Sequence, residues 1–119
     1  MGFREHLQDV VRSVDGAVAC SLMGMDGIEV DTHLTDELGL DLRSLLVEFS
    51  TLFHNARGAA AGHEAGAVSE LSIQTERVLT VARLVSSEYF MVAALRPDGN
   101  FGKARYMLRI TAPKLAAEL

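Results

Sequence analysis

A chain of 119 residues, 49% of them hydrophobic and 23% charged, is long enough to build one globular core without metal ions or disulfides. The formal net charge of −5 and the scattered Lys and Arg residues argue against nucleic acids and anionic membrane surfaces as partners. No apolar run could insert across a membrane, and the charged first residues do not resemble a signal peptide. The single cysteine, Cys20, lies in an apolar run and fits a buried position in a reducing compartment, so we expect a cytoplasmic location.

The first part of the chain predicts a helix followed by a β-hairpin. In residues 3–14, apolar side chains recur every three or four positions, which is typical of one buried helix face. The apolar run 17–23 and the alternating segment 28–32 predict two strands, with Ile28, Val30 and Thr32 on one side. The Asp26-Gly27 pair between the strands favours a tight turn.

The strongest periodic signal predicts one long helix over residues 42–62. Its apolar side chains form a single face over four turns: Leu42, Leu45, Leu46, Phe49, Leu52, Phe53 and Ala56. We expect Asp41 to cap the N-terminus of this helix and Gly62 to end it.

Three further strands and a last helix complete the prediction. The strands cover residues 67–75, 78–85 and 89–95, and the last of them is apolar enough to be a central strand buried on both faces. Asn100 is expected to cap the last helix, in which Pro113 predicts a kink or an early end. The predicted fold class is α/β, with a five-stranded, mostly antiparallel sheet between helices, in a single domain over residues 1–119.

The order of these elements resembles the Roadblock / dynein light chain family, which includes bacterial regulators of the MglB type. The resemblance runs from about Phe3 to Leu119. It is carried by the turn Met25-Asp26-Gly27-Ile28, by the long helix, and by the segment PDGNFGKARY that leads into the last helix. The resemblance implies a roadblock fold and a homodimer, in which the two long helices pack together and the third strands pair edge to edge.

The residues themselves offer two surfaces for such a dimer. The third strand would lie at a sheet edge, where exposed backbone groups invite pairing with another chain. Small or semi-polar side chains flank the apolar face of the long helix and could let a second helix approach, although simple solvation is the alternative. The candidate dimer or partner interface is therefore Val47, Ser50, Thr51, His54, Glu70, Ser72 and Gln74.

No residue pattern indicates an enzyme, and we expect neither a cofactor nor a metal ion. The chain has no glycine-rich loop followed by Lys and Ser or Thr, and no nucleophile motif. The spaced glycines of the long helix and the following loop lack the strand-then-helix frame of a dinucleotide site. The four histidines are too scattered to predict a zinc site. The glycines are Gly58, Gly62 and Gly66, and the histidines are His6, His33, His54 and His63.

The resemblance implies a small Ras-like GTPase, of the MglA type, as the partner. The protein would stimulate hydrolysis, promote nucleotide exchange, or localise the GTPase. An arginine could in principle reach the phosphoryl-transfer site, although each candidate could equally be a surface cation: Arg57, Arg77, Arg83 and Arg105. Two alternatives remain open, a structural adaptor in a larger motor or motility assembly, and an enzyme or small-molecule sensor with an internal pocket.

Overall fold

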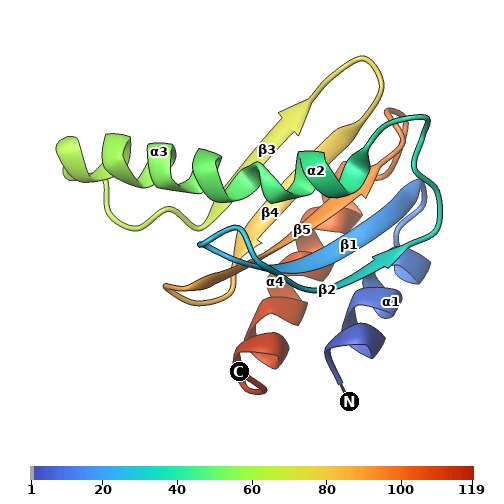
Figure 1. Cartoon of the computed structure of the whole chain (residues 1–119), viewed down its shortest axis with the longest axis horizontal. Coiled ribbons are helices and arrows are strands. Elements are labelled where there is room, and N and C mark those ends of the chain that lie inside the picture. Colours follow the sequence, from blue (N-terminus) through green and yellow to red (C-terminus); the bar gives the residue numbers. More distant parts are fainter. Residues whose placement is uncertain (1) are drawn as a thin grey trace.

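A five-stranded antiparallel sheet in the order β2-β1-β5-β4-β3 forms the centre of the protein (Figure 1). The structure is a computed structural model that describes residues 2–119. Helices lie on both sides of this sheet, which confirms the predicted fold class. The elements in chain order are α1 (Phe3–Ser13), β1 (Ala17–Gly24), β2 (Glu29–Leu34), α2 (Leu42–Val47), α3 (Phe49–Gly62), β3 (Glu70–Gln74), β4 (Leu79–Leu84), β5 (Tyr89–Leu95) and α4 (Phe101–Ala116).

Two apolar clusters fill the space between the three layers. Helices α1 and α4 cover one face of the sheet, and α2 with α3 lies across the other (Figure 1). The first cluster includes Leu7, Val10, Cys20, Leu22, Val81, Met91, Leu108 and Leu115. The second includes Val18, Met23, Leu42, Leu46, Phe49, Phe53, Phe90 and Val92. Alternate strand residues serve the two clusters, because successive side chains of a strand point to opposite faces.

Several predicted details are confirmed. Strand β5 occupies the middle of the sheet and is buried along almost its whole length. Asp41 caps α2, since its Oδ1 atom accepts the amide of Ser44 at 3.3 Å. Asn100 caps α4 in the same way, accepting the amide of Lys103 at 3.0 Å. Both caps provide partners for amide groups that a helix cannot bond internally.

The predicted long helix differs from the observed one at one position. Glu48 separates α2 from α3, and its amide is shared between the carbonyl oxygens of Ser44, at 3.3 Å, and Leu45, at 3.2 Å. Such a three-centre bond tightens one turn without changing the overall direction. The two helices therefore run end to end as one rod, whose C-terminal end extends beyond the sheet (Figure 1).

The expectation of an early end at Pro113 is wrong. Helix α4 continues through Pro113 to Ala116, and the amide of Ala117 still bonds to the carbonyl oxygen of Pro113 at 3.1 Å. Proline removes one amide from the helix and frees the carbonyl one turn earlier. Because Pro113 is exposed, water can solvate the freed group, and the helix does not need to stop.

The second strand and the third strand also differ from the expectation. A β-bulge between Leu22 and Met23 interrupts the pairing of β1 with β2, so the predicted alternation of Ile28, Val30 and Thr32 is lost. Ile28 lies outside β2 and is 66% exposed, whereas Thr32 is buried. Strand β3 is shorter than predicted, because residues 63–69 form an exposed connection before it.

Candidate partner-binding surface

The apolar face predicted for the long helix is divided into a buried half and an open half. Four side chains on one side of α2 and α3 are completely covered by the sheet: Leu42, Leu46, Phe49 and Phe53. The remaining three, Leu45, Leu52 and Ala56, lie on the adjacent flank and keep part of their surface open. Leu45 remains 36% exposed and lines a shallow pocket with Thr75 at the β3–β4 turn. This apolar flank therefore faces the β3 side of the molecule.

Strand β3 forms one edge of the sheet and has an unpaired side. The amide of Thr75 donates to the carbonyl oxygen of Val78, and the amide of Leu84 donates to the carbonyl oxygen of Ser69, both at 2.9 Å. In an antiparallel ladder these bonded positions alternate with positions whose backbone groups point outward. The register therefore directs the backbone amides and carbonyls of three residues toward the open edge: Glu70, Ser72 and Gln74.

The side chains of β3 fall on two different faces. Glu70, Ser72 and Gln74 stand opposite Arg83, Val81 and Leu79, so they share the face covered by α4. Ile73 points to the other face, where it is 39% exposed beside the apolar flank of α2 and α3. An open strand edge and a partly exposed apolar flank thus lie next to each other.

The other flank of the long helix faces β2. Val47 and Ser50 approach the β1–β2 turn, where a Cβ atom on Gly27 would lie 3.4 Å from Ser50 Oγ and 3.8 Å from Val47 Cγ1. His54 Nε2 lies 3.0 Å from the carbonyl oxygen of Met25 at the end of β1. Thr51 is exposed, whereas Ser50 is buried and donates a hydrogen bond to the carbonyl oxygen of Val47.

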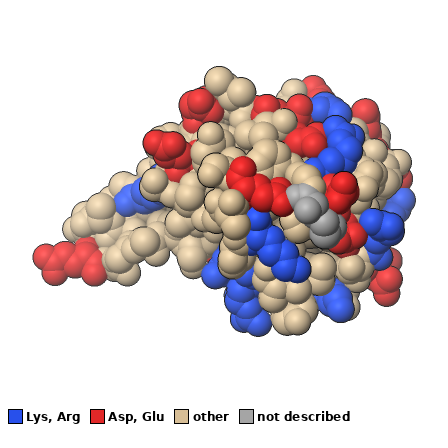
Figure 2. Space-filling model, turned by 90° about the horizontal axis from the view of Figure 1, so that it is seen from below, with Lys and Arg blue, Asp and Glu red and all other residues tan. Residues whose placement is uncertain are grey.

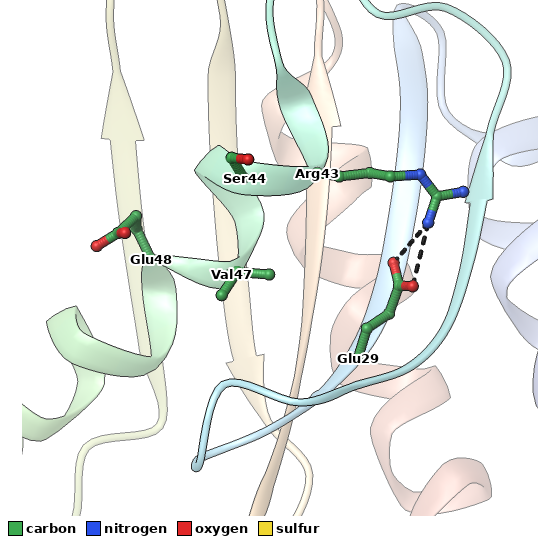
Figure 3. A pocket seen from close by; sticks show the side chains of 5 residues that line it. All are labelled: Glu29, Arg43, Ser44, Val47 and Glu48. Carbon is green, nitrogen blue, oxygen red and sulfur yellow. Dashed lines mark hydrogen bonds and ion pairs between the residues drawn. The ribbon is translucent and has the colours of Figure 1, made fainter.

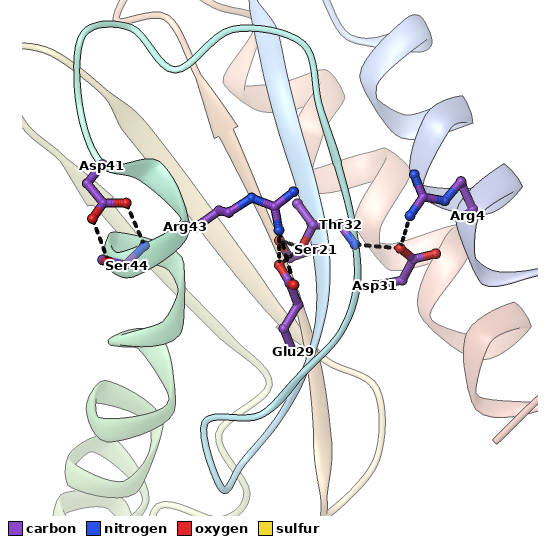
Figure 4. Close-up of polar contacts among 8 residues, drawn as sticks. All are labelled: Arg4, Ser21, Glu29, Asp31, Thr32, Asp41, Arg43 and Ser44. Carbon is purple, nitrogen blue, oxygen red and sulfur yellow. Dashed lines mark hydrogen bonds and ion pairs between the residues drawn. The ribbon is translucent and has the colours of Figure 1, made fainter.

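A polar chain joins the centre of the sheet to this β2-facing flank. The hydroxyl groups of Ser21 and Thr32 are buried and lie 2.7 Å apart, and Thr32 also donates to Glu29. Arg43 of α2 donates to both Glu29 oxygens, at 2.9 and 3.1 Å (Figure 4). Figure 3 shows Arg43 reaching from α2 to Glu29 across an open pocket of about 280 Å³, which Val47 also lines.

The four arginines considered as donors to a GTPase active site are dispersed. Arg57 donates to the carbonyl oxygen of Ser87, and Arg77 to those of Leu38 and Gly39. Arg105 is held by Glu70, which raises the pKa of its guanidinium through a hydrogen bond and through charge attraction. Arg83 lies in the same pocket as Arg105. Arg83 and Arg105 thus share one pocket, whereas Arg57 and Arg77 bond to backbone carbonyl groups elsewhere, so the structure does not gather all four into one site.

The histidines are equally dispersed. His6 is buried, with its Nε2 atom 3.5 Å from a carboxylate oxygen of Glu118, and His63 is exposed after α3. Within residues 2–119, no three His, Cys, Asp or Glu side chains are grouped so that they could hold a metal ion. In the same part of the chain, no helix combines the length and apolarity needed to cross a bilayer.

Sequence reasoning missed the residues on the β3-facing flank. Periodicity places Leu45 and Leu52 in the core, because their spacing matches that of their buried neighbours. Alternation does the same for Ile73, and the partial exposure of these three side chains depends on how far the sheet extends beneath the helix. The width of the apolar stripe gives no warning, because it is typical of a helix that faces a core.

The sheet order, with a long helical rod on one face and two helices on the other, defines a roadblock fold. The chain belongs to the Roadblock family. It is 57% identical to MglC from Myxococcus xanthus, covering 100% of both chains with a TM-score of 0.71. A Roadblock/LC7 domain from Streptomyces avermitilis superimposes with a TM-score of 0.86 at 14% identity, over 99% of this chain and 98% of the other.

A third structure, the gliding protein MglB from Thermus thermophilus, is 16% identical. It covers 96% of this chain and 85% of its own, with a TM-score of 0.84. At such low identity, the last two comparisons support the fold alone. No family model and no curated protein matches the chain.

Proposed function

We propose that this protein is a cytoplasmic, non-catalytic homodimer that binds a small Ras-like GTPase and regulates it. The observation that carries the proposal is the position of the open β3 edge beside the apolar flank of Leu45, Leu52 and Ala56. A second copy paired along β3 would cover both features at once, since it would extend the sheet and bring the two helical rods together. The 57% identity to MglC of Myxococcus xanthus supports a regulatory role.

Dimerisation through β3 would leave the β2-facing flank of each rod open. Val47, Thr51 and His54 on this flank would then be available to the GTPase, while Glu70, Ser72 and Gln74 would supply the strand pairing. Such a surface can regulate a GTPase only if it binds the GTP and GDP states with different affinities. The proposal therefore requires a partner whose capture depends on its nucleotide.

The decisive experiment is capture of partners with the immobilised protein from a lysate of its source organism. The lysate is divided and loaded either with a non-hydrolysable GTP analogue or with GDP, and bound proteins are identified by mass spectrometry. We expect a Ras-like GTPase to be enriched in one nucleotide state. Thr51→Arg on α3 should abolish this enrichment, whereas Ser13→Arg, an exposed position at the end of α1, should not.

Capture of equal amounts in both states, or of no GTPase, would contradict the regulator proposal. Equal capture of other proteins would favour the alternative function, a structural adaptor in a larger assembly. Enrichment that survives Thr51→Arg would retain the GTPase but place its contact elsewhere on the protein.

The dimer itself can be tested at Ser72. Its backbone amide points to the open edge, so Ser72→Pro removes a donor that the monomer does not use. We expect Ser72→Pro to shift the protein toward monomer in analytical ultracentrifugation, while Ser72→Ala, which keeps the amide, remains dimeric. A Ser72→Pro variant that is as dimeric as the wild type would show that the edge is not the interface.

A further inference from the structure

The outer face of α4 concentrates positive charge on an acidic protein. The whole chain carries 11 Lys and Arg residues against 16 Asp and Glu residues. Helix α4 contains four of those cations and no acidic residue. Figure 2, which views the molecule from below Figure 1, shows blue side chains gathered along the lower part of this surface. We call the following set the α4 basic face: Arg83, Lys103, Arg105, Tyr106, Arg109 and Lys114.

Most cations elsewhere are neutralised by carboxylates, but most of those on the α4 basic face are not. Four ion pairs lie outside this face: Arg4 with Asp31, Arg12 with Asp9, Arg43 with Glu29, and Arg96 with Asp36. On the α4 basic face, Arg105 has a carboxylate partner, Glu70. Among the described residues, 2–119, no ion pair joins an acidic side chain to the remaining four cations, Arg83, Lys103, Arg109 and Lys114.

Part of the α4 basic face forms a small polar pocket of about 170 Å³ between β3, β4 and α4. Glu70 lies directly opposite Arg83 in the strand register and is bonded instead to Arg105, whose Nε atom lies 3.0 Å from both carboxylate oxygens. Arg109 lines the same pocket. Three guanidinium groups and one carboxylate therefore line this pocket, which leaves an excess of positive charge. Each guanidinium can bind a carboxylate through two parallel hydrogen bonds.

An exposed aromatic ring stands between two of these cations. Tyr106 is 46% exposed, and the Lys103 Nζ and Arg109 Cζ atoms each lie 5.8 Å from the centroid of its ring. The negative face of the ring attracts both cations and favours side-chain conformations that keep them close to the ring. Tyrosine and arginine, together with tryptophan, are enriched among the residues that contribute most to the binding energy of protein interfaces.

We propose that the α4 basic face binds an acidic segment of a partner protein. The charge and the aromatic ring match a polypeptide that carries several carboxylates among apolar side chains. Nucleic acids and anionic membranes fit less well, because an extended polyanion would also meet the acidic remainder of a chain whose total net charge is −5. The α4 basic face lies on the side of the sheet opposite α2 and α3, so an acidic partner and a GTPase could bind together.

Pairing of two copies along β3 would place both basic faces on one side of the continuous sheet. Antiparallel strands related by a twofold axis keep the same face upward, so the two α4 helices would flank the joined edges. A partner with two acidic segments would then bind with increased avidity. This consequence rests on the dimer proposed above, whereas binding of a single acidic segment does not.

The test uses a fluorescein-labelled peptide of Glu, Leu and Ala, with a matched peptide in which every Glu is Gln, measured by fluorescence anisotropy. We expect the full-length protein to bind the Glu peptide and not the Gln peptide, and to lose affinity as salt rises from about 50 to about 500 mM. The variant Lys103→Glu/Arg109→Glu should bind about tenfold more weakly, because two attractive contacts become repulsive. The variant Arg12→Glu/Arg57→Glu, with the same net charge, should bind like the wild type.

A change of opposite sign provides a second test. Glu70→Gln removes the internal carboxylate that occupies Arg105, and it should strengthen binding of the Glu peptide about twofold to threefold. A merely structural role for the ion pair would leave the affinity unchanged or lower it. Circular dichroism melting of each variant checks that the fold is retained.

Three results would overturn the proposal. The first is no binding of the Glu peptide, and the second is equal binding by Lys103→Glu/Arg109→Glu and the wild type. The third is tighter binding of phosphatidylserine vesicles or single-stranded DNA, added as competitors. The variant Ser72→Pro, which is expected to be monomeric, should retain binding of the single peptide, so failure of the dimer and failure of the basic face give different results.

Discussion

Gly16 and Gly99 lie so close together that a Cβ atom on Gly16 would stand 2.6 Å from the Cα atom of Gly99. Gly16 also has a φ of +87°, a backbone conformation that residues other than glycine rarely adopt. The amide of Arg96 donates to the carbonyl oxygen of Gly16 at 2.8 Å, and the amide of Asn100 donates to the carbonyl oxygen of Asp15 at 2.9 Å. The α1–β1 turn is thus bonded to the β5–α4 turn, although these two turns lie near opposite ends of the chain.

The first prediction follows from this contact. Gly16→Ala should lower the free energy of unfolding by about 2 kcal/mol or more, because the new methyl group meets the backbone of Gly99 and the positive φ is strained. Gly58→Ala is the control, since a Cβ atom at Gly58 in α3 meets nothing within 4 Å. It should be neutral or stabilise by up to about 1 kcal/mol. Equal effects of the two substitutions in urea unfolding would contradict the close approach.

The sequence was sufficient to predict features that depend on local chemistry. The order of elements, the central position of β5 and the caps Asp41 and Asn100 follow from periodicity and from side chains that bond to nearby amides. The same reasoning places Cys20 among apolar neighbours, and the structure confirms its complete burial. These signals lie within a few residues of the feature they predict.

Features that depend on distant parts of the chain could not be predicted. Nothing in the local sequence distinguishes Leu45 from Leu46, yet one is 36% exposed and the other 1%. The difference arises from where the sheet ends beneath the helix. The ion pair of Glu70 with Arg105 joins residues 35 positions apart, so the α4 basic face becomes visible only when β3, β4 and α4 are assembled.

The second prediction concerns the cap of α2. The Ser44 hydroxyl donates to Asp41 Oδ2 at 2.7 Å and the Ser44 amide donates to Oδ1, and both bonds lower the pKa of Asp41 below its ordinary value of 3.8. A lowered pKa means that the folded protein prefers the ionised carboxylate. The stabilising contribution is therefore present in full above the unfolded-state pKa and is lost as the pH falls through the lowered one.

Asn also caps helices but does not titrate in this range, so Asp41→Asn isolates the effect. The difference in unfolding free energy between the wild type and Asp41→Asn should decrease as the pH falls below 3.8 and stay constant above about pH 6. Chemical denaturation at a series of pH values measures it. A difference that does not change with pH would show that the carboxylate charge does not contribute to the cap.

The third prediction concerns Cys20, whose burial raises the pKa of its thiol to about 12. The thiolate is the reactive form, and it is both unfavourable and inaccessible in the folded protein. Cys20 should therefore react with a disulfide reagent only as fast as the protein unfolds. A Ser87→Cys variant offers an exposed thiol in the β4–β5 turn and should react at once. Comparable rates for the two thiols in the native protein would refute the burial of Cys20.

The fourth prediction separates folding from dimerisation with two neighbouring leucines. Leu46 is 1% exposed beneath α2, so Leu46→Ala should lower the free energy of unfolding by about 2 to 5 kcal/mol. Leu45 lies on the open flank, so Leu45→Ala should change the stability of the monomer by less than about 1 kcal/mol. It should nevertheless raise the dimer dissociation constant, because that flank would be covered by the second copy.

Urea unfolding of both variants in the Ser72→Pro background measures the monomer, and sedimentation of the otherwise unchanged variants measures the dimer. The separation is necessary because the apparent stability of a dimer depends on protein concentration. If Leu45→Ala leaves the dissociation constant unchanged, the apolar flank is not part of the dimer interface, and its exposure must serve another partner. If Leu45→Ala destabilises the monomer as much as Leu46→Ala does, the division of the helix into a buried half and an open half is itself wrong.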